Sequence, residues 1–148
     1  MLLLREMSIG DSDQIEQLEQ EIFNDAWTKA GIEETFRQSH AFVVVAEENN
    51  RIKGYCIVYY VMDEAEIARI AVDNNHRNSG AGGKLLKKTE EFCMEKGVTR
   101  LLLDVRMSNE TAIRFYRHHG FTEDGIRKKF YEKPEEDALL MSKNIFQE

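Results

Sequence analysis

Two side chains in the second half of the chain have the types and surroundings needed to move protons. Asp104 interrupts the leucine run of residues 101–105. A carboxylate in a buried strand needs compensation, so Asp104 is either exposed near the strand end or functional. Tyr116 lies seven residues beyond Asn109 on a predicted helix, and its phenol could donate a proton to a leaving group. From spacing alone, a core aromatic whose hydroxyl is bonded elsewhere explains Tyr116 equally well.

A glycine-rich turn precedes these residues, between a predicted buried strand and a predicted helix. Gly80, Gly82 and Gly83 open the helical pattern, although glycine costs about 1 kcal/mol relative to alanine inside a helix. Helix N-termini carry free N–H groups and partial positive charge, and glycines let an anion approach them. The neighbouring residues form the most basic part of the chain: His76, Arg77, Lys84, Lys87 and Lys88. We expect a phosphate-rich ligand here; a helix start that merely tolerates glycine is the alternative.

Two better-known glycine loops do not fit this turn. A P-loop needs Ser or Thr after its lysine, whereas Leu85 follows Lys84. A dinucleotide fingerprint that starts at Gly80 would need glycine where Leu85 stands. The pattern that remains is Arg77-x-x-Gly80-x-Gly82.

Length and composition set the broad class of the protein. The chain has 148 residues, which suits a single domain over 1–148, and its net charge of −7 argues against general nucleic-acid binding. The apolar run of residues 2–4 is too short for a signal peptide, and no stretch is long enough for a membrane span. Cys56 and Cys93 lie in apolar patterns typical of reduced core thiols, so we expect a cytoplasmic protein. The histidines show no metal-binding spacing.

The periodicity of apolar residues predicts the elements that position the candidate residues. Strands are expected at 2–7, 41–47, 52–62, 64–72, 100–105, 121–130 and 137–145, and helices at 11–24, 28–39, 80–97 and 109–120. Asp11 with Gln14 suggests a capping box for the first helix. The strand–helix–strand succession over residues 64–105 implies a parallel crossover. The predicted fold class is therefore α+β, with a mixed, mostly antiparallel sheet that has one parallel pair near its middle.

A longer motif connects the two candidate proton-transfer residues. It reads Leu102-Leu103-Asp104-Val105-Arg106-x-Ser108-Asn109-x-x-Ala112-Ile113-x-Phe115-Tyr116-x-x-x-Gly120-Phe121. With Ile70-Ala71-Val72, Gly125-x-Arg127-x-x-Phe130-Tyr131 and Glu136-Asp137-Ala138-x-x-Met141, it resembles the RimI-type ribosomal-protein-alanine N-acetyltransferases of the GCN5-related N-acetyltransferase (GNAT) superfamily. The glycine turn is similar to the acyl-CoA pyrophosphate loop of that superfamily.

The resemblance implies a fold, a cosubstrate and residue roles. In the GNAT acyl-CoA N-acyltransferase fold, helices cover both faces of the sheet, and two central parallel strands splay apart around the thioester. Asp104 would be the general base and Tyr116 the general acid. Acetyl-CoA, without a metal, would be held by Ile70, Ala71, Val72, Arg77, Asn78, Ser79, Gly80, Ala81, Gly82, Gly83 and Asn109.

The acceptor implied by the resemblance is the N-terminal alanine of small-subunit ribosomal protein number eighteen. The partner would then be a basic protein N-terminus, with neither nucleic acid nor membrane involved. The acidic stretches 63–66 and 132–137 could attract it, or they could be solvated loops. Two alternatives stay open: acetylation of a small-molecule amine such as a polyamine, amino acid or drug, and a non-catalytic acyl-CoA-binding regulatory module.

Three departures from the family pattern bear on these roles. The usual base is glutamate, whereas Asp104 is one methylene shorter; the family's Pro-Trp-Ser reads Ala26-Trp27-Thr28, and its Tyr-Tyr pair reads Phe130-Tyr131. An aspartate is a weak base, since a free one titrates near ~3.9. A peptide α-amine with a pKa near ~8 is about one-tenth neutral at pH 7, whereas a lysine near ~10.4 is hardly so. A short base therefore suits an α-amine better than a lysine.

Overall fold

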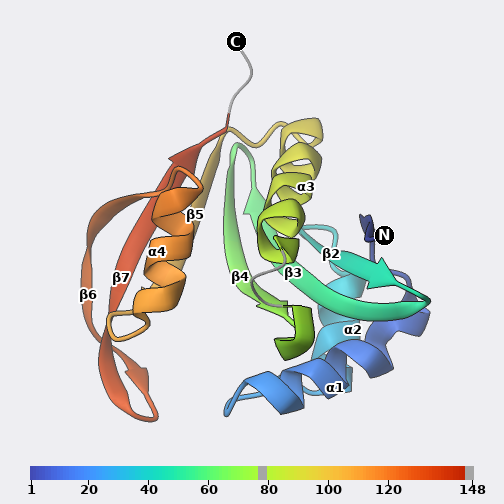
Figure 1. The fold of residues 1–148 in the computed structure, drawn as a ribbon. Helices are drawn as coiled ribbons and strands as arrows, with labels where there is room; N and C mark the ends of the chain where they lie inside the picture. The colour runs from blue at the N-terminus through green and yellow to red at the C-terminus, as the bar shows by residue number, and fades with distance from the viewer. Residues whose placement is uncertain (77–79, 146–148) are drawn as a thin grey trace.

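The protein is described here by a computed structural model that covers residues 1–76 and 80–145. Within these residues, seven strands form one sheet in the order β1-β2-β3-β4-β5-β7-β6 (Figure 1). The strands are β1 (Leu3–Glu6), β2 (Ala41–Glu48), β3 (Arg51–Val61), β4 (Glu64–Val72), β5 (Arg100–Arg106), β6 (Thr122–Glu132) and β7 (Glu135–Asn144). The helices are α1 (Ser12–Ile22), α2 (Lys29–Arg37), α3 (Ala81–Glu95) and α4 (Glu110–His118), with 3-10 turns at Ile9–Asp11 and Asn74–His76. The predicted order of elements is confirmed.

Two helices begin at side chains that cap them. The Thr28 hydroxyl accepts a hydrogen bond from the backbone N–H of Gly31 at 3.1 Å, and the Asn109 side chain accepts one from Ala112 at 3.1 Å. Each bond satisfies an N–H group that has no partner inside the helix. Both residue types are common at helix N-caps, and each stands at the start of a predicted helix.

The capping box expected from Asp11 and Gln14 is wrong. The Asp11 carboxylate accepts from the backbone N–H of Ser8 at 2.8 Å and from Arg5 at 2.8 Å, one turn before α1. The Gln14 side chain instead accepts from the backbone N–H of Ile52 at 2.8 Å. Both side chains therefore tie α1 to the sheet and to the segment before it, because tertiary partners compete with the local cap.

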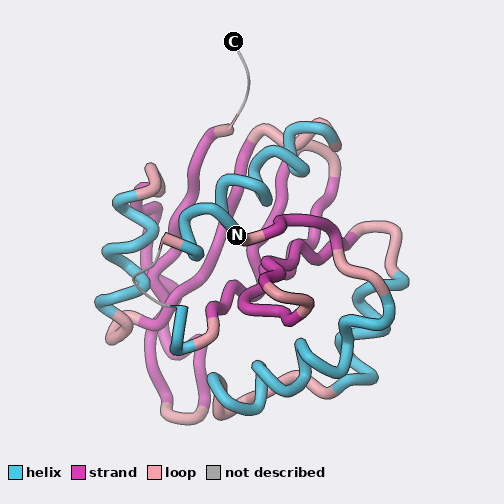
Figure 2. The backbone as a smooth tube through the Cα atoms, turned by 45° about the vertical axis from the view of Figure 1, so that its right-hand side comes forward, coloured by secondary structure: helices cyan, strands magenta, loops and turns pink. Residues whose placement is uncertain are grey.

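Two apolar clusters lie on opposite faces of the sheet. One joins α3 and α4 to the sheet and includes Val44, Cys56, Ala65, Ile67, Leu85, Leu101, Leu103, Ile113 and Tyr116. The other joins α1 and α2 to the sheet and includes Ile15, Leu18, Ile32, Val43, Val45, Tyr55 and Ile57. Figure 2 shows helices on both sides of the strands. The alternation of inward side chains along β2 and β3 follows from the two-residue period of a strand.

The parallel pair β4–β5 is short. Its ladder comprises Glu64 with Arg100, Ala65 with Leu101, and Glu66 with Leu102. Within the described residues the two strands form no further ladder with each other: β4 continues against β3, and β5 continues against β7. In Figure 1 the ribbons of β4 and β5 diverge from this point. The predicted splayed pair is thus present.

Further expectations from composition can be compared with the structure. Cys56 and Cys93 are free and buried, as expected, and burial raises the pKa of each thiol to about 12. No helix formed by the described residues combines the length and apolar character needed to cross a membrane. Among the same residues, no three metal-ligating side chains of the His, Cys, Asp and Glu types gather into a group.

Candidate active site

Asp104 lies on β5 beside the opening between β4 and β5. Its neighbours Leu103 and Val105 are buried toward α3 and α4, so the alternation of the strand directs Asp104 to the face that carries α1 and α2. No described residue donates a hydrogen bond to its carboxylate. An acceptor oxygen without an internal donor is available to take a proton.

Tyr116 approaches the opening from the other face. It is 7% exposed, and its ring packs edge-on against Phe115 and Phe121, each at 5.4 Å between centroids. Burial, with contributions from Cys56 and Tyr131, raises the pKa of the Tyr116 hydroxyl. The hydroxyl therefore stays protonated at neutral pH, as a general acid requires, and no described residue hydrogen-bonds it.

The structure does not bring Asp104 and Tyr116 into direct contact. They extend from opposite faces of the sheet, with the β4–β5 opening between them. The charge of Asp104 nevertheless contributes to the raised pKa of Tyr131, and Tyr131 contributes to the raised pKa of Tyr116. The two candidate residues thus flank one opening, which is compatible with a base that acts on an amine and an acid that acts on the leaving group.

Tyr131 was assigned no role from the sequence. It is half-buried on β6, its ring lies 4.3 Å from the Arg106 guanidinium carbon, and burial followed by Asp104 raises its pKa. A register shift between Arg127 and Tyr131 interrupts the pairing of β6 with β7. Periodicity could not have indicated this side chain, because the irregularity resets the alternation of the strand.

One member of the acidic stretch 63–66 faces the site. Partial burial, and then the Asp104 carboxylate, raise the pKa of Glu66, while Arg127 opposes the shift. The other acidic side chain of the β4 start, Glu64, pairs with Arg100 at 3.2 Å. In the second acidic stretch, residues 132–137, the Glu136 carboxylate accepts a hydrogen bond from the backbone N–H of Ser108 at 2.6 Å and forms an ion pair with Arg106 at 3.3 Å. The Glu136 carboxylate therefore stabilises the segment that leads into α4.

The structural reason for glycine at Gly80 differs from the reason at Gly82 and Gly83. Gly80 precedes α3 with φ +83°, and a Cβ added to it would meet no atom within 4 Å. Its left-handed conformation favours glycine, and it leaves the start of α3 open. Ala81, the first residue of α3, is buried. The expected residues Arg77, Asn78 and Ser79 lie outside the described part of the chain.

Gly82 and Gly83 have a packing role that sequence reasoning did not anticipate. A Cβ on Gly82 would lie 3.2 Å from the Phe115 ring, and one on Gly83 would lie 2.9 Å from the His119 ring. The missing side chains thus let the start of α3 approach α4. Helix packing is therefore one reason for glycine at these two positions, and their expected contact with a ligand stays a prediction.

His119, at the end of α4, packs through its ring. Its ring stacks on Phe115 with centroids 4.6 Å apart. Burial, and then His118 and Lys143, lower its pKa. The neutral ring therefore predominates at neutral pH, and its contribution is packing between α4 and α3.

The remaining expected cosubstrate residues lie along the opening. Ile70, Ala71 and Val72 pair with β3, and the ladder between β4 and β5 ends before them, at Glu66. Asn109 caps α4 through its side-chain oxygen. A strand edge can present backbone N–H groups to a carbonyl, and the open start of α3 can receive phosphate. These features fit an acyl thioester with a phosphorylated tail.

Known proteins share this arrangement. The acetyltransferase (GNAT) family profile matches residues 12–121. A Bacillus subtilis protein, provisionally named a ribosomal protein bS18-alanine N-acetyltransferase, is 36% identical over 139 residues, which are 93% of this chain and 92% of its own.

Solved structures agree with the sequence comparison. The ribosomal-protein-S18-alanine N-acetyltransferase from Escherichia coli superposes with a TM-score of 0.90 at 27% identity, covering 100% of this chain and 96% of its own. A GNAT acetyltransferase from Elizabethkingia anophelis with acetyl-CoA bound shares the fold, with a TM-score of 0.77 at 22% identity over 97% of each chain. The family match over most of the chain and the full-length relative lead to one conclusion: this chain belongs to the acetyltransferase (GNAT) family.

Proposed function

We propose that this protein transfers the acetyl group of acetyl-CoA to the N-terminal α-amine of a protein, with the N-terminal alanine of ribosomal protein bS18 as the acceptor. The observation that carries the proposal is the opening between β4 and β5, flanked by Asp104 and Tyr116. The names of the Bacillus subtilis and Escherichia coli relatives support this acceptor. A ribosomal acceptor places the reaction in the cytoplasm.

The proposed chemistry is a direct attack by the amine. The amine nitrogen bonds to the thioester carbonyl carbon, the carbon–sulfur bond breaks, and the nitrogen loses a proton. Asp104 would accept that proton from the side of α1 and α2. Tyr116, protonated in its buried position, would protonate the departing sulfur from the side of α3 and α4.

The cosubstrate is proposed to lie along β4 and the start of α3. A backbone N–H group within the segment Ile70, Ala71 and Val72 would polarise the thioester carbonyl. Gly80, with Arg77, Asn78 and Ser79, would receive the pyrophosphate, together with Ala81, Gly82 and Gly83 at the start of α3. The Asn109 amide would contact the pantetheine arm.

Acceptor peptides that differ only in the available amine test the proposal. The purified protein is incubated with acetyl-CoA and a peptide with the bS18 N-terminal sequence, with the same peptide blocked at its N-terminus but carrying lysine, or with spermidine. Mass spectrometry of each product is expected to show one acetyl group on the free N-terminal peptide and none on the blocked one. Transfer to spermidine or lysine in preference to the α-amine would overturn the acceptor, and coenzyme A binding without transfer to any amine would overturn the enzymatic role.

A further inference from the structure

A fully buried carboxylate lies beneath the sheet on the face that carries α1 and α2. Glu19 of α1 is 0% exposed. It accepts hydrogen bonds from the Tyr55 hydroxyl, from the Trp27 backbone N–H at 2.9 Å, and from Arg69 Nη2 at 2.9 Å. A buried charge is costly unless it is paired and hydrogen-bonded, so this carboxylate depends on those donors.

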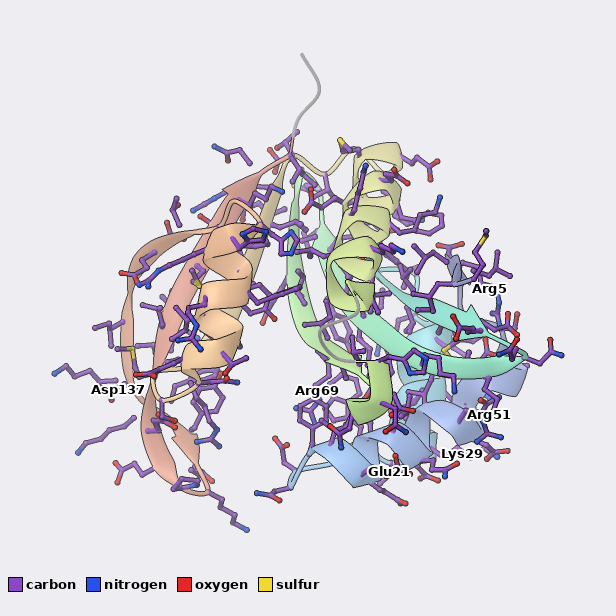
Figure 3. All side chains as sticks on the ribbon, viewed as in Figure 1. Arg5, Glu21, Lys29, Arg51, Arg69 and Asp137 are labelled. Atoms are coloured by element: carbon purple, nitrogen blue, oxygen red, sulfur yellow. The ribbon has the colours of Figure 1, made fainter. Side chains whose placement is uncertain are left out.

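Arg69 of β4 is the cation of this cluster, and it reaches beyond Glu19. Its Nη2 also donates to the backbone carbonyl of Asp25 at 3.1 Å and to the Asp25 carboxylate at 3.2 Å. Its guanidinium carbon lies 3.7 Å from the Phe23 ring centroid and 5.9 Å from that of Trp27. Figure 3 shows Arg69 between β4 and the helical layer below it.

These contacts converge on the connection between α1 and α2. Residues 23–28 contain neither helix nor strand. Their conformation is fixed by Arg69 against Phe23, Asp25 and Trp27, and by Glu19 on the Trp27 N–H. A guanidinium suits this task, since its planar fork holds several acceptors in one geometry and stacks on rings.

The connection between α1 and α2, residues 23–28, also lies near the candidate active site. The Asp25 side chain is 77% exposed, and its charge contributes to the raised pKa of Tyr131, after burial and nearer groups. Tyr131 is also influenced by Asp104. Arg69 itself lies on β4 three residues beyond Glu66, where the ladder with β5 ends, and it bonds Glu19 and Asp25 on the face that carries α1 and α2. The segment held by Arg69 therefore borders the side of the β4–β5 opening from which a base would serve the acceptor amine.

We propose that Arg69 and Glu19 are positioning residues for the acceptor: their buried ion pair locks the segment 23–28 into the wall against which the acceptor N-terminus is placed. The inference rests on the proposed function, since it concerns the acceptor side of that site. A reacting amine must be held close to its attack geometry, and a displacement of about 1 Å can lower the rate about a hundredfold. A wall fixed before binding also reduces the ordering cost of binding.

Two variants separate positioning from folding. Arg69→Met removes the guanidinium but leaves Glu19 as a buried, unpaired charge, which by itself destabilises the fold. The double variant Glu19→Gln/Arg69→Met leaves no unpaired charge, while the hold on Phe23 and Asp25 is still lost. Arg69→Lys keeps the charge and loses the fork, so it is expected to retain part of the function.

A matched control is available at the far edge of the sheet. Arg5 of β1 also bonds two carboxylates, Asp11 at 2.8 Å and Glu47 at 3.1 Å. In the strand order it is separated from β4 by β2 and β3. Arg5→Met therefore removes a comparable ion-pair cluster without touching the segment 23–28.

The experiment measures KM for the bS18 N-terminal peptide and for acetyl-CoA, together with the emission of Trp27, the single tryptophan. We expect Arg69→Met and the double variant to raise the peptide KM at least about tenfold, with the KM for acetyl-CoA within about twofold. The peptide KM of Arg69→Lys is expected to lie between the values of these variants and that of the wild type. Trp27 emission is expected to shift to longer wavelength in the double variant, and Arg5→Met is expected to leave all of these values unchanged.

The outcomes distinguish this inference from the proposed function. An unchanged peptide KM in the double variant, or an equal rise in both KM values, would overturn the positioning role. If the wild type acetylates no peptide, the proposed acceptor fails instead, and the positioning of an acceptor falls with it. In that case Trp27 emission still shows whether Arg69 and Glu19 hold the segment, and unchanged emission would overturn the lock itself.

Discussion

Removing only the Tyr116 hydroxyl separates the chemistry of this residue from its packing. In Tyr116→Phe the ring keeps its contacts with Phe115 and Phe121, each at 5.4 Å between centroids. The lost hydroxyl has no hydrogen-bond partner among the described residues. The change breaks no hydrogen bond among these residues, so the free energy of unfolding should stay within about 1 kcal/mol of the wild type.

The effect on catalysis should be far larger. A positioned general acid typically contributes about 10²- to 10⁴-fold to a rate, which is about 2.7 to 5.5 kcal/mol of barrier. We therefore expect kcat to fall at least about a hundredfold, while the KM for acetyl-CoA changes little because the cosubstrate still binds along β4 and α3.

The assay can follow coenzyme A release with a thiol reagent. Cys56 and Cys93 are buried with pKa values raised to about 12, so they should not react during the measurement. Tyr60→Phe is the control: its hydroxyl donates to the Ser39 carbonyl at 3.2 Å, away from the opening, and kcat should not change. If Tyr116→Phe raised the KM for acetyl-CoA and left kcat intact, Tyr116 would be a packing or binding residue, and the general-acid reasoning would be refuted.

Three further predictions test other parts of the structure. Asp104→Asn should lower kcat about 10- to 100-fold at pH 7 and less at pH 9, because an α-amine with a pKa near ~8 is then already neutral; an equal loss at both pH values, in a pH-rate profile, would contradict a base role. Gly83→Ala should destabilise the protein in thermal unfolding, because its Cβ would lie 2.9 Å from the His119 ring and this clash outweighs the ~1 kcal/mol that alanine gains over glycine in a helix; in a His119→Ala background the same change should stabilise instead. Burial would raise the pKa of Asp11, but the hydrogen bonds from Arg5 and from the Ser8 N–H, together with the charge of Arg5, outweigh it and lower the pKa. Asp11 therefore contributes stability that is present above its unfolded pKa and is lost as the pH falls through its folded pKa, so denaturant unfolding should show Asp11→Asn about 2 kcal/mol less stable at pH 7 and no less stable near pH 2.

The sequence was sufficient for the order of elements because local signals and apolar periodicity agree along most of the chain. Thr28 and Asn109 cap their helices as their residue types predict. The parallel crossover followed from a strand, a helix and a strand in succession, and the short ladder that ends at Glu66 provides the opening. These features are local, or nearly so, and a single sequence carries them.

The parts that sequence reasoning missed depend on contacts between distant segments. Glu19 and Arg69 are 50 positions apart and showed no motif, although a charged residue at an inward helix position was a signal that could have been followed. The packing of Gly83 against His119 joins two segments that are far apart in the sequence. Tyr131 follows a register shift that no pattern of alternation reveals.

The central claim is that the opening between β4 and β5 orients a thioester between Asp104 and Tyr116. It is tested most directly by a crystal structure of the protein with a bisubstrate analogue that joins coenzyme A to the bS18 N-terminal peptide. We expect the sulfur within hydrogen-bonding distance of the Tyr116 hydroxyl, the acyl carbonyl against the β4 edge at residues 70–72, and the peptide nitrogen on the Asp104 side. A sulfur atom bound away from Tyr116, or a peptide that enters from the face of α3 and α4, would contradict this account.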